Sequence, residues 1–325
     1  MLRPASLFLS VLFLAGMLAG AAEAAPEKRV ALVIGNAAYA SISRLEKPLN
    51  DSQRIADVLR GMGFEVILGT NTSKADLEAL ADRFRTAMKG ADVGFFYYSG
   101  HGFQTNRVEQ QHPVNHIVPV DFKVREDATL ATLPLDVVIE TLKREARVGF
   151  VFMDACRNDP QLAAASERMA ASGTRAVTIS RGFARVSVAT AQPAAAKQAA
   201  RKGPAGLLIA YATDPGNVAF EGDKGPLSPF TGALVKHMAT PGLTVGEMMG
   251  RVSVDVSSET QGQQTPWNVS SLTAGTYQFL PRAPGAPSAS QRGQGTTPAR
   301  KSAGSPNPNR SNLPPNLGGG VGAGL

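Results

Sequence analysis

Short apolar runs alternate along this chain with longer stretches in which apolar residues recur at helical spacing. The short runs are rich in Val, Ile, Phe and Tyr and predict buried strands, which cover residues 30–34, 64–68, 93–98, 148–153, 207–212 and 277–280. Helices are predicted between them at residues 50–62, 73–89, 135–146, 229–239 and 244–257. Strands that alternate with helices are typical of an α/β fold whose mostly parallel sheet carries helices on both faces.

The first residues do not belong to this pattern. Arg3 gives a positive start, residues 7–18 form an apolar run, and small residues follow at 22–24. The run is shorter than the about 20 apolar residues that a membrane-spanning helix needs, and the order of features is that of a signal peptide. We therefore expect residues 1–25 to be removed and the protein to be exported, periplasmic or secreted; an uncleaved signal anchor is the alternative.

Two later segments also lack the pattern. Residues 161–205 are rich in Ala, Ser, Thr and basic residues, and so long a connection without regular structure is usually functional or disordered. Residues 282–325 contain no aromatic residue and are mostly Pro, Gly, Ser, Asn and Gln, which cannot bury enough apolar surface to order themselves. We expect one domain at 26–281, built from parts at 26–160 and 206–281 that a flexible basic connection joins, followed by a disordered tail.

The net charge of +7 does not indicate a basic folded domain. The basic connection and the tail together carry twelve Lys or Arg residues and a single Glu, so the rest of the chain is mildly acidic. A nucleic-acid-binding domain concentrates its basic residues on the folded surface. Nucleic-acid binding by the folded part is therefore not expected.

Candidate chemistry lies directly after two of the predicted strands. The one cysteine of the chain, Cys156, follows the strand at 148–153, and His101 follows the strand at 93–98. Carboxyl ends of parallel strands meet at one edge of a sheet, where active sites form. A free cysteine is most often a small buried hydrophobe, but Asp154 and Arg157 beside it are not core residues. A thiol and an imidazole that meet at such an edge form a nucleophile and its base.

These residues also resemble a known family. Ser-Gly-His-Gly at 99–102 and Asp-Ala-Cys-Arg at 154–157 are similar to the motifs of caspase-like cysteine peptidases (peptidase C14), above all to their metacaspase and bacterial orthocaspase branches. Further matching segments extend the resemblance from residue 27 to about 281, at 29–36, 48–51, 119–121, 211–219, 228–231 and 264–267. The resemblance implies a caspase-like (caspase-hemoglobinase) fold with a mostly parallel six-stranded sheet, and the activity of a cysteine endopeptidase.

The resemblance also assigns roles to the dyad. His101 would take the thiol proton of Cys156 and later give a proton to the leaving amine. The backbone N–H groups of Gly102 and Cys156 would form the oxyanion hole. A catalytically silent binding or scaffold protein of the cell envelope that keeps this fold is the alternative function.

Specificity is implied by acidic residues. In metacaspase-like enzymes the pocket for the residue before the cut (the S1 pocket) is lined by positions that correspond here to Asp51, Ser99 and Asp154. Two partly buried carboxylates need a cation, which an Arg or Lys side chain supplies, and bidentate geometry favours Arg. The expected partners are thus proteins or peptides with Arg or Lys before the cut. A helix N-cap for Asp51 and a turn for Asp154 are the alternatives.

Caspase-like enzymes are commonly matured by cutting the connection between their two parts, and an enzyme specific for basic residues would find its own substrates there. The candidate residues before the cut are Arg175, Arg181, Arg185, Lys197, Arg201 and Lys202. Residues 181–188 resemble a segment that packs in relatives, so we favour the stretch 197–202.

No cofactor is predicted, and no metal site is assigned. His112 and His116 have a spacing that could bind zinc on a helix, but Pro113 and the polar loop around them argue against a helix. Many metacaspases require calcium, and candidate ligands would be Asp121, Glu126 and Asp127.

Overall fold

The computed structural model describes residues 26–106, 114–123, 130–156, 178–180, 205–213, 219, 221–273 and 277–282. Contacts divide the chain into two units, residues 1–282 and 283–325, and the described residues all lie in the first. The predicted signal peptide, most of the basic connection and the predicted tail lie outside the described residues. In the described part of the chain, no helix is both long enough and apolar enough to cross a membrane.

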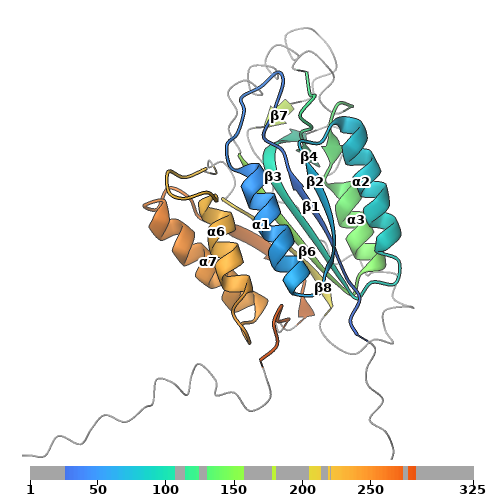
Figure 1. Ribbon diagram of the computed structural model, residues 1–325, viewed down its shortest axis with the longest axis vertical. Helices are drawn as coiled ribbons and strands as arrows, with labels where there is room; N and C mark the ends of the chain where they lie inside the picture. The colour runs from blue at the N-terminus through green and yellow to red at the C-terminus, as the bar shows by residue number, and fades with distance from the viewer. Residues whose placement is uncertain are drawn as a thin grey trace, which may run out of the picture. The chain divides into compact units, whose positions relative to one another are not determined.

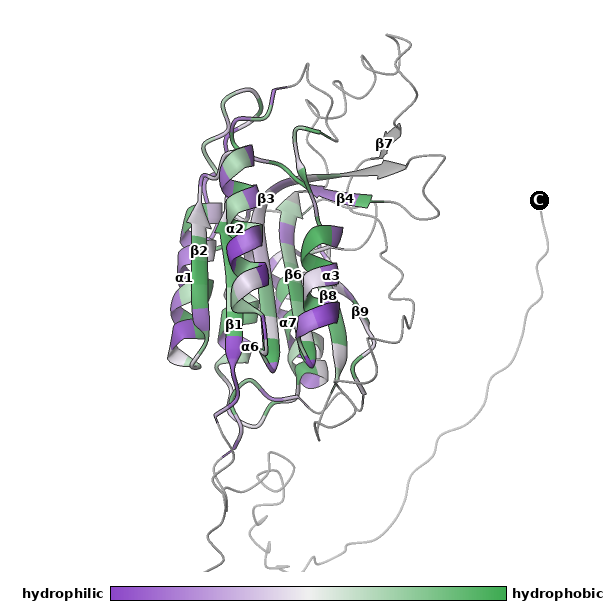
Figure 2. Ribbon diagram, turned by 90° about the vertical axis from the view of Figure 1, so that its right-hand side faces the viewer, coloured by the Kyte–Doolittle hydropathy of each residue, from purple (hydrophilic) through white to green (hydrophobic). Residues whose placement is uncertain are grey.

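Six strands form the central sheet in the order β2-β1-β3-β6-β8-β9 (Figures 1 and 2; β9 is labelled in Figure 2). Neighbouring strands are parallel, except that β9 runs antiparallel to β8. Their bounds are β1 Arg29–Gly35, β2 Glu65–Thr70, β3 Val93–Asn106, β6 Val148–Cys156, β8 Gly206–Tyr211 and β9 Trp267–Ser270. The prediction of a mostly parallel six-stranded sheet is therefore confirmed.

Helices cover both faces of this sheet (Figure 1). One face carries α1 Pro48–Gly61, α6 Pro229–Met238 and α7 Val245–Glu259, and the other carries α2 Lys74–Ala87 and α3 Asp136–Glu145. Successive side chains of a strand point to opposite faces, and each face of the sheet packs into its own apolar cluster. Figure 2 shows the sheet strands as largely hydrophobic, whereas the helices carry both colours.

The polar loop predicted around His112 and His116, residues 103–116, is wrong at both of its ends, because both ends are strands. β3 continues beyond the parallel sheet to Asn106, and there it pairs antiparallel with β4 Val114–Ile117. β4 in turn pairs with the short β5 Leu133–Pro134, and β7 Thr178–Ser180 pairs with the end of β3. Polar residues such as Gln104, Thr105 and Asn115 lie within these strands, so the polar composition of the segment predicted a loop.

The predicted strand at 277–280 is also wrong, and among the described residues the last strand is β9. The side chains of Tyr277 and Phe279 are buried in the core against Phe150, with ring centroids 5.0 and 4.8 Å from it. The backbone carbonyl of Tyr277 accepts from the N–H of Val245 at 2.8 Å, where α7 begins. This segment is apolar because its aromatic rings fill the core, and it does not belong to the sheet.

Candidate active site

The carboxyl ends of β3 and β6 lie side by side. In the parallel register His101 is the partner of Cys156, and Ser99 is the partner of Asp154. For Cys156 this pairing concerns the backbone, because its side chain lies outside the described part of the structure. The two segments that the sequence marked as chemically active thus reach the same edge of the sheet.

The buried imidazole of His101 is held by uncharged groups. Its Nε2 lies 2.8 Å from the carbonyl oxygen of Ser43, and its ring packs on Tyr39 with the centroids 4.5 Å apart. Its backbone N–H donates to Tyr39 Oη at 2.8 Å, and the hydroxyl of Tyr98 donates to its carbonyl at 2.6 Å. Because a carbonyl only accepts, Nε2 must carry a proton, and the lone pair of the neutral ring is then on Nδ1.

Gly100 makes room for this arrangement. Its φ is +154°, and a Cβ atom built on it would lie 2.6 Å from the hydroxyl oxygens of both Tyr39 and Tyr98. Any other residue would displace the two tyrosines that hold His101. The glycine before the histidine in Ser-Gly-His-Gly is therefore required by close packing.

The backbone N–H of Gly102 points toward the side of β3 that carries β6. The carbonyl of Ser99 accepts from Asn36 N–H at 2.9 Å, and that of His101 accepts from Val118 N–H at 3.2 Å, so both face the β1 side. N–H groups of successive strand residues alternate in direction. The Gly102 N–H accordingly faces the side on which Cys156 ends.

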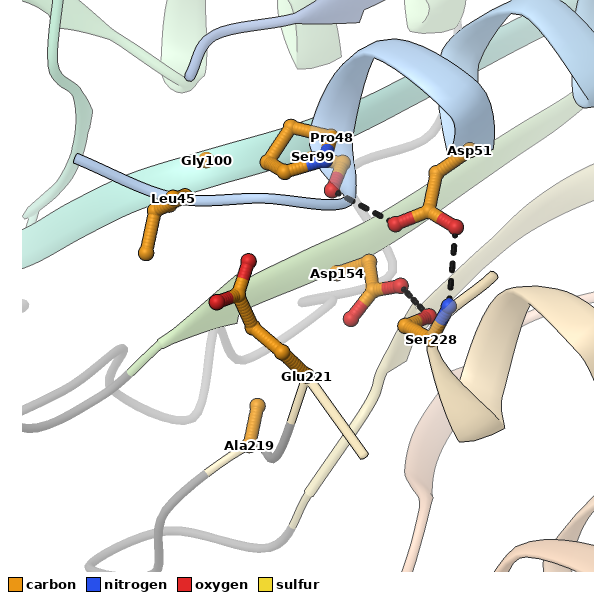
Figure 3. Close-up of a pocket in the computed structure, with 9 residues that line it drawn as sticks. All are labelled: Leu45, Pro48, Asp51, Ser99, Gly100, Asp154, Ala219, Glu221 and Ser228. Carbon is orange, nitrogen blue, oxygen red and sulfur yellow. Dashed lines mark hydrogen bonds between the residues drawn. The ribbon is translucent and has the colours of Figure 1, made fainter. Parts of the chain in front are cut away.

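Two buried carboxylates, Asp51 of α1 and Asp154 of β6, lie beside this edge (Figure 3). Ser228 joins them, since its N–H donates to Asp51 at 2.9 Å and its hydroxyl donates to Asp154. The hydroxyl of Ser99 donates to the other oxygen of Asp51 at 3.2 Å. The structure thus brings together all three predicted pocket residues.

Further hydroxyls surround Asp154. Thr231 Oγ1–H donates to its Oδ2 at 2.8 Å, and the hydroxyl of Tyr97 lies 3.4 Å from the same oxygen and 2.5 Å from Thr231 Oγ1. Burial, followed by the charge of Asp154, raises the pKa of Asp51 to about 8. Burial also raises the pKa of Asp154, although the hydroxyls that donate to it work in the opposite direction. A cation placed between the two carboxyls would remove much of this cost.

The sequence of residues 28–277 matches the family model of the caspase domain, Peptidase C14. This chain belongs to the caspase domain family. The observed fold agrees with the caspase-like architecture of that family.

Individual relatives of this caspase-domain protein are distant. The human mucosa-associated lymphoid tissue lymphoma translocation protein 1 and its mouse homolog are each 30% identical over 76 residues, which is 23% of this chain and 9% of each relative. Protein GSU0716 from Geobacter sulfurreducens is similar in structure with a TM-score of 0.49 at 16% identity, over 75% of this chain and 93% of that one. The Drosophila initiator caspase Dronc gives 0.45 at 11% identity, over 74% and 78%.

Several groups in this caspase-domain site were not predicted as site residues. They are Ser43, which holds His101 through its carbonyl, and Glu221 and Ser228, which line the pocket. Ser228 had a sequence signal, because it is the N-cap of α6, and its Oγ accepts from Thr231 N–H at 3.0 Å. For Ser43 the sequence holds no signal, since any residue has a backbone carbonyl.

The alternative roles considered for the two acids do not fit. Helix α1 begins at Pro48 with Lys47 as its N-cap residue, so Asp51 is not the N-cap. Asp154 lies within β6 and not in a turn. Both carboxyl groups face the pocket that Figure 3 shows, which is lined by Leu45, Pro48, Asp51, Ser99, Gly100, Asp154, Ala219, Glu221 and Ser228.

Gly35, at the end of β1, lets α1 approach the sheet closely. A Cβ atom at this position would lie 2.2 Å from Ser52 Oγ and 2.3 Å from the carbonyl oxygen of Pro48. The first turn of α1, which carries Asp51, therefore rests directly on the strand end. The position of one pocket carboxylate is set by this contact.

The remaining candidates have other contacts or lie outside the described residues. His116 bonds through Nδ1 to Thr132 Oγ1 at 3.0 Å and stacks on Phe103, and Asp121 accepts from the N–H of Lys74 at 3.0 Å. Across the described ranges, no three His, Cys, Asp or Glu side chains gather as a metal site would need. Outside the described residues lie His112, Glu126, Asp127 and all six self-cleavage candidates, Arg175, Arg181, Arg185, Lys197, Arg201 and Lys202.

Proposed function

We propose that this protein is a cysteine endopeptidase that cleaves after Arg, or less efficiently after Lys, through the dyad of His101 and Cys156. The observation that carries the proposal is the pair of buried carboxylates, Asp51 and Asp154, beside the edge at which β3 and β6 present the dyad residues in register. A family that cleaves peptide bonds supplies the reaction, and the charge of the pocket supplies the preference.

The uncharged contacts of His101 suit it to act as the base. Nδ1 takes the Sγ proton of Cys156, whose ordinary pKa of about 8.5 leaves little thiolate at neutral pH. The sulfur then attacks the carbonyl carbon, and the N–H groups of Gly102 and Cys156 stabilise the oxyanion. The imidazolium gives its proton to the leaving amine, and water hydrolyses the acyl-enzyme. The Ser43 carbonyl keeps Nε2–H in place throughout.

The polar lining of the pocket favours a guanidinium. Asp51 and Asp154 each keep lone pairs beyond those used by their neutral donors, and the partly exposed Glu221 adds a third carboxylate. Five N–H donors in a planar fork can reach several of these oxygens at once, which an ammonium group does less well. An aspartate side chain would be repelled, so we do not expect cleavage after Asp.

The deciding experiment compares three fluorogenic peptides that differ only in Arg, Lys or Asp before the cut. Wild type should turn over the Arg peptide fastest and the Asp peptide not at all, and Cys156→Ala and His101→Ala should abolish turnover while far-UV circular dichroism stays unchanged. Preferential cleavage after Asp would contradict the assigned pocket. A folded wild type that cleaves none of the peptides would favour the silent binding or scaffold protein.

We also propose that the enzyme is of the metacaspase or orthocaspase type and is exported to the periplasm or secreted. Asp154 and the sequence Asp-Ala-Cys support the branch, and the sequence features of residues 1–25 support export. Amino-terminal sequencing of the protein recovered from the envelope or the medium tests export. A mature chain that still begins at Met1 would contradict signal-peptide removal.

Self-cleavage within residues 161–205 is the expected route of maturation, and β7 supports one candidate above the others. β4 and β7 both pair with Gln104 and Thr105 of β3, so the two strands lie on opposite sides of β3. β4 lies on the β1 side, and β7 therefore lies on the side of β3 that pairs with β6. Because Thr178 pairs with Asn106 and Ser180 with Gln104, β7 runs toward His101. Arg181 is the next residue in the sequence, and this direction favours it over the stretch 197–202.

Denaturing gels test this maturation. Wild type should separate into two fragments, and Cys156→Ala should stay a single band. If the cut follows Arg181, Arg181→Gln should greatly slow the cleavage and Lys197→Gln should not, with peptide mass mapping to locate the new end. Fragmentation that Lys197→Gln blocks and Arg181→Gln leaves unchanged would favour the later stretch.

A further inference from the structure

Lys47 is a buried cation to which the proposed mechanism gives no role. Its residue is 7% exposed, and its ammonium group donates to the carbonyl oxygens of Gly222 at 2.6 Å and Leu227 at 3.2 Å. Burial of a charged ammonium group is costly unless it is paired or hydrogen-bonded. The position of Lys47 therefore depends on residues about 175 positions later in the chain.

Residues 221–228, which we term the pocket segment, carry two of the groups that line the pocket, Glu221 and Ser228. The pocket segment is held to the start of α1 at both ends. Near its start, Glu221 accepts from the backbone N–H of Lys47 at 3.2 Å, and near its end Leu227 accepts from the Lys47 ammonium. The next residue, Ser228, bridges Asp51 and Asp154.

The ammonium group acts here through position more than through charge. In the described part of the structure its hydrogen bonds go to backbone carbonyls. Burial together with Asp154 still raises the pKa of Asp51 to about 8 despite the positive charge of Lys47 nearby. Lys47 therefore does not neutralise the two acidic groups, and a cation from the substrate can still pair with them. A cation that formed an ion pair with Asp51 would instead compete with the substrate cation for it.

We propose that Lys47 is a positioning residue of the substrate pocket, fixing the pocket segment against α1 so that Ser228 and Glu221 face Asp51 and Asp154. This inference rests on the proposed preference for Arg. It predicts that Lys47 controls the affinity for an Arg side chain and leaves the reactivity of the His101–Cys156 dyad unchanged, because His101 is held by Tyr39, Ser43 and Tyr98.

The test compares Lys47→Met, which keeps the unbranched side chain up to the ammonium group but has no donor, with Lys47→Arg, which keeps the charge and the donors. Loss of hydrogen bonds from a charged group predicts a rise of about 10- to 100-fold in KM for the Arg peptide, with kcat within about twofold. Lys47→Arg should recover a large part of the KM. Alkylation of Cys156 by iodoacetamide should proceed at the wild-type rate in both variants.

Two controls separate positioning from loss of the fold. Lys74→Met removes a lysine from the first turn of α2, where it pairs with Glu78, and should leave KM unchanged. If Lys47→Met does not fold, Asn50→Ala removes the weaker bond from the exposed Asn50 to the Pro226 carbonyl, 3.3 Å long, and should raise KM about two- to fivefold.

The outcomes distinguish this inference from the proposed function. An unchanged KM in folded Lys47→Met, or a fall in kcat with slower alkylation, overturns the positioning role while the peptidase assignment stands. A wild type that does not cleave the Arg peptide refutes the proposed function instead. In that case calorimetric titration with agmatine, a small guanidine, still measures whether Lys47→Met weakens the pocket, and equal affinity in both proteins would overturn the inference.

Discussion

His101 and the carboxylate pair of Asp51 and Asp154 lie at one edge of the sheet, yet different kinds of contact hold them. The backbone and the ring of His101 are held by two tyrosines and a backbone carbonyl, all uncharged and all from the first part of the chain. The carboxylates are joined through Ser228, which comes from beyond the basic connection. Under the proposed function, this difference predicts that reactivity and selectivity can be altered separately, since the two sets of contacts share no hydrogen bond among those described.

The largest effect should come from neutralising the pocket. Asp154→Asn or Asp51→Asn removes one partner of a buried charge pair, which costs about 2–5 kcal/mol and corresponds to about 30- to 5,000-fold in kcat/KM for the Arg peptide. Most of this loss should appear in KM. Steady-state kinetics with the Arg and Lys peptides would measure it, and a loss confined to kcat would contradict the separation of the two regions.

A smaller effect of the opposite kind is expected at Tyr39. Tyr39→Phe keeps the ring that packs on His101 but removes the hydroxyl that accepts its backbone N–H. A buried donor left without its acceptor costs about 1–3 kcal/mol, so we expect kcat to fall about 5- to 150-fold and KM for the Arg peptide to stay near wild type. Slower alkylation of Cys156 should accompany the fall. If KM rises instead, the two regions are coupled.

The smallest effect is the dependence on pH over the single unit below the pKa of Asp51. The Arg side chain needs an ionised Asp51, whose pKa is raised to about 8, so KM should fall by up to about tenfold per pH unit as the pH rises toward 8 and then level off. The Asp51→Asn variant should show a flatter KM profile. The rate of Cys156 alkylation over the same pH range reports the ionisation of the dyad. The kinetics are corrected for this ionisation before the KM profiles of wild type and Asp51→Asn are compared.

Stability should change with pH in the opposite sense. A carboxyl whose pKa is raised from 3.8 to about 8 binds its proton more tightly in the folded protein than in the unfolded chain. Its contribution to stability is therefore greatest below pH 3.8 and declines as the pH rises toward 8. Affinity for a basic substrate thus increases over the range in which this group costs the fold stability.

The sequence predicted the layered architecture well because the central strands β1, β3, β6 and β8 are buried on both faces of the sheet and leave continuous apolar runs. The prediction was wrong where a buried apolar segment is not a strand, and where a strand is not fully buried. Tyr277 and Phe279 are as apolar as a strand would be but only fill the core. β9, at Trp267–Ser270, has exposed residues at every second position. This four-residue strand leaves no continuous apolar run in the sequence, so it was not predicted.

The site was predictable to the extent that its residues lie in local motifs. Asp51, Ser99 and Asp154 were assigned through the resemblance, and the structure brings them together. Glu221 and Lys47 were not singled out, because their importance arises from hydrogen bonds between segments that are far apart in sequence. Such pairs leave no periodicity or motif in a single chain.

The bare Cα of Gly35 has a consequence for the substrate. Because nothing separates β1 from the first turn of α1, the depth at which Asp51 stands is set by a backbone-to-helix contact and not by an adaptable side chain. The depth of the pocket at Asp51 is therefore fixed. Under the proposed function, an Arg side chain would meet Asp51 at a fixed depth, so we expect arginine analogues that are one methylene shorter or longer to be distinguished by length as well as by charge.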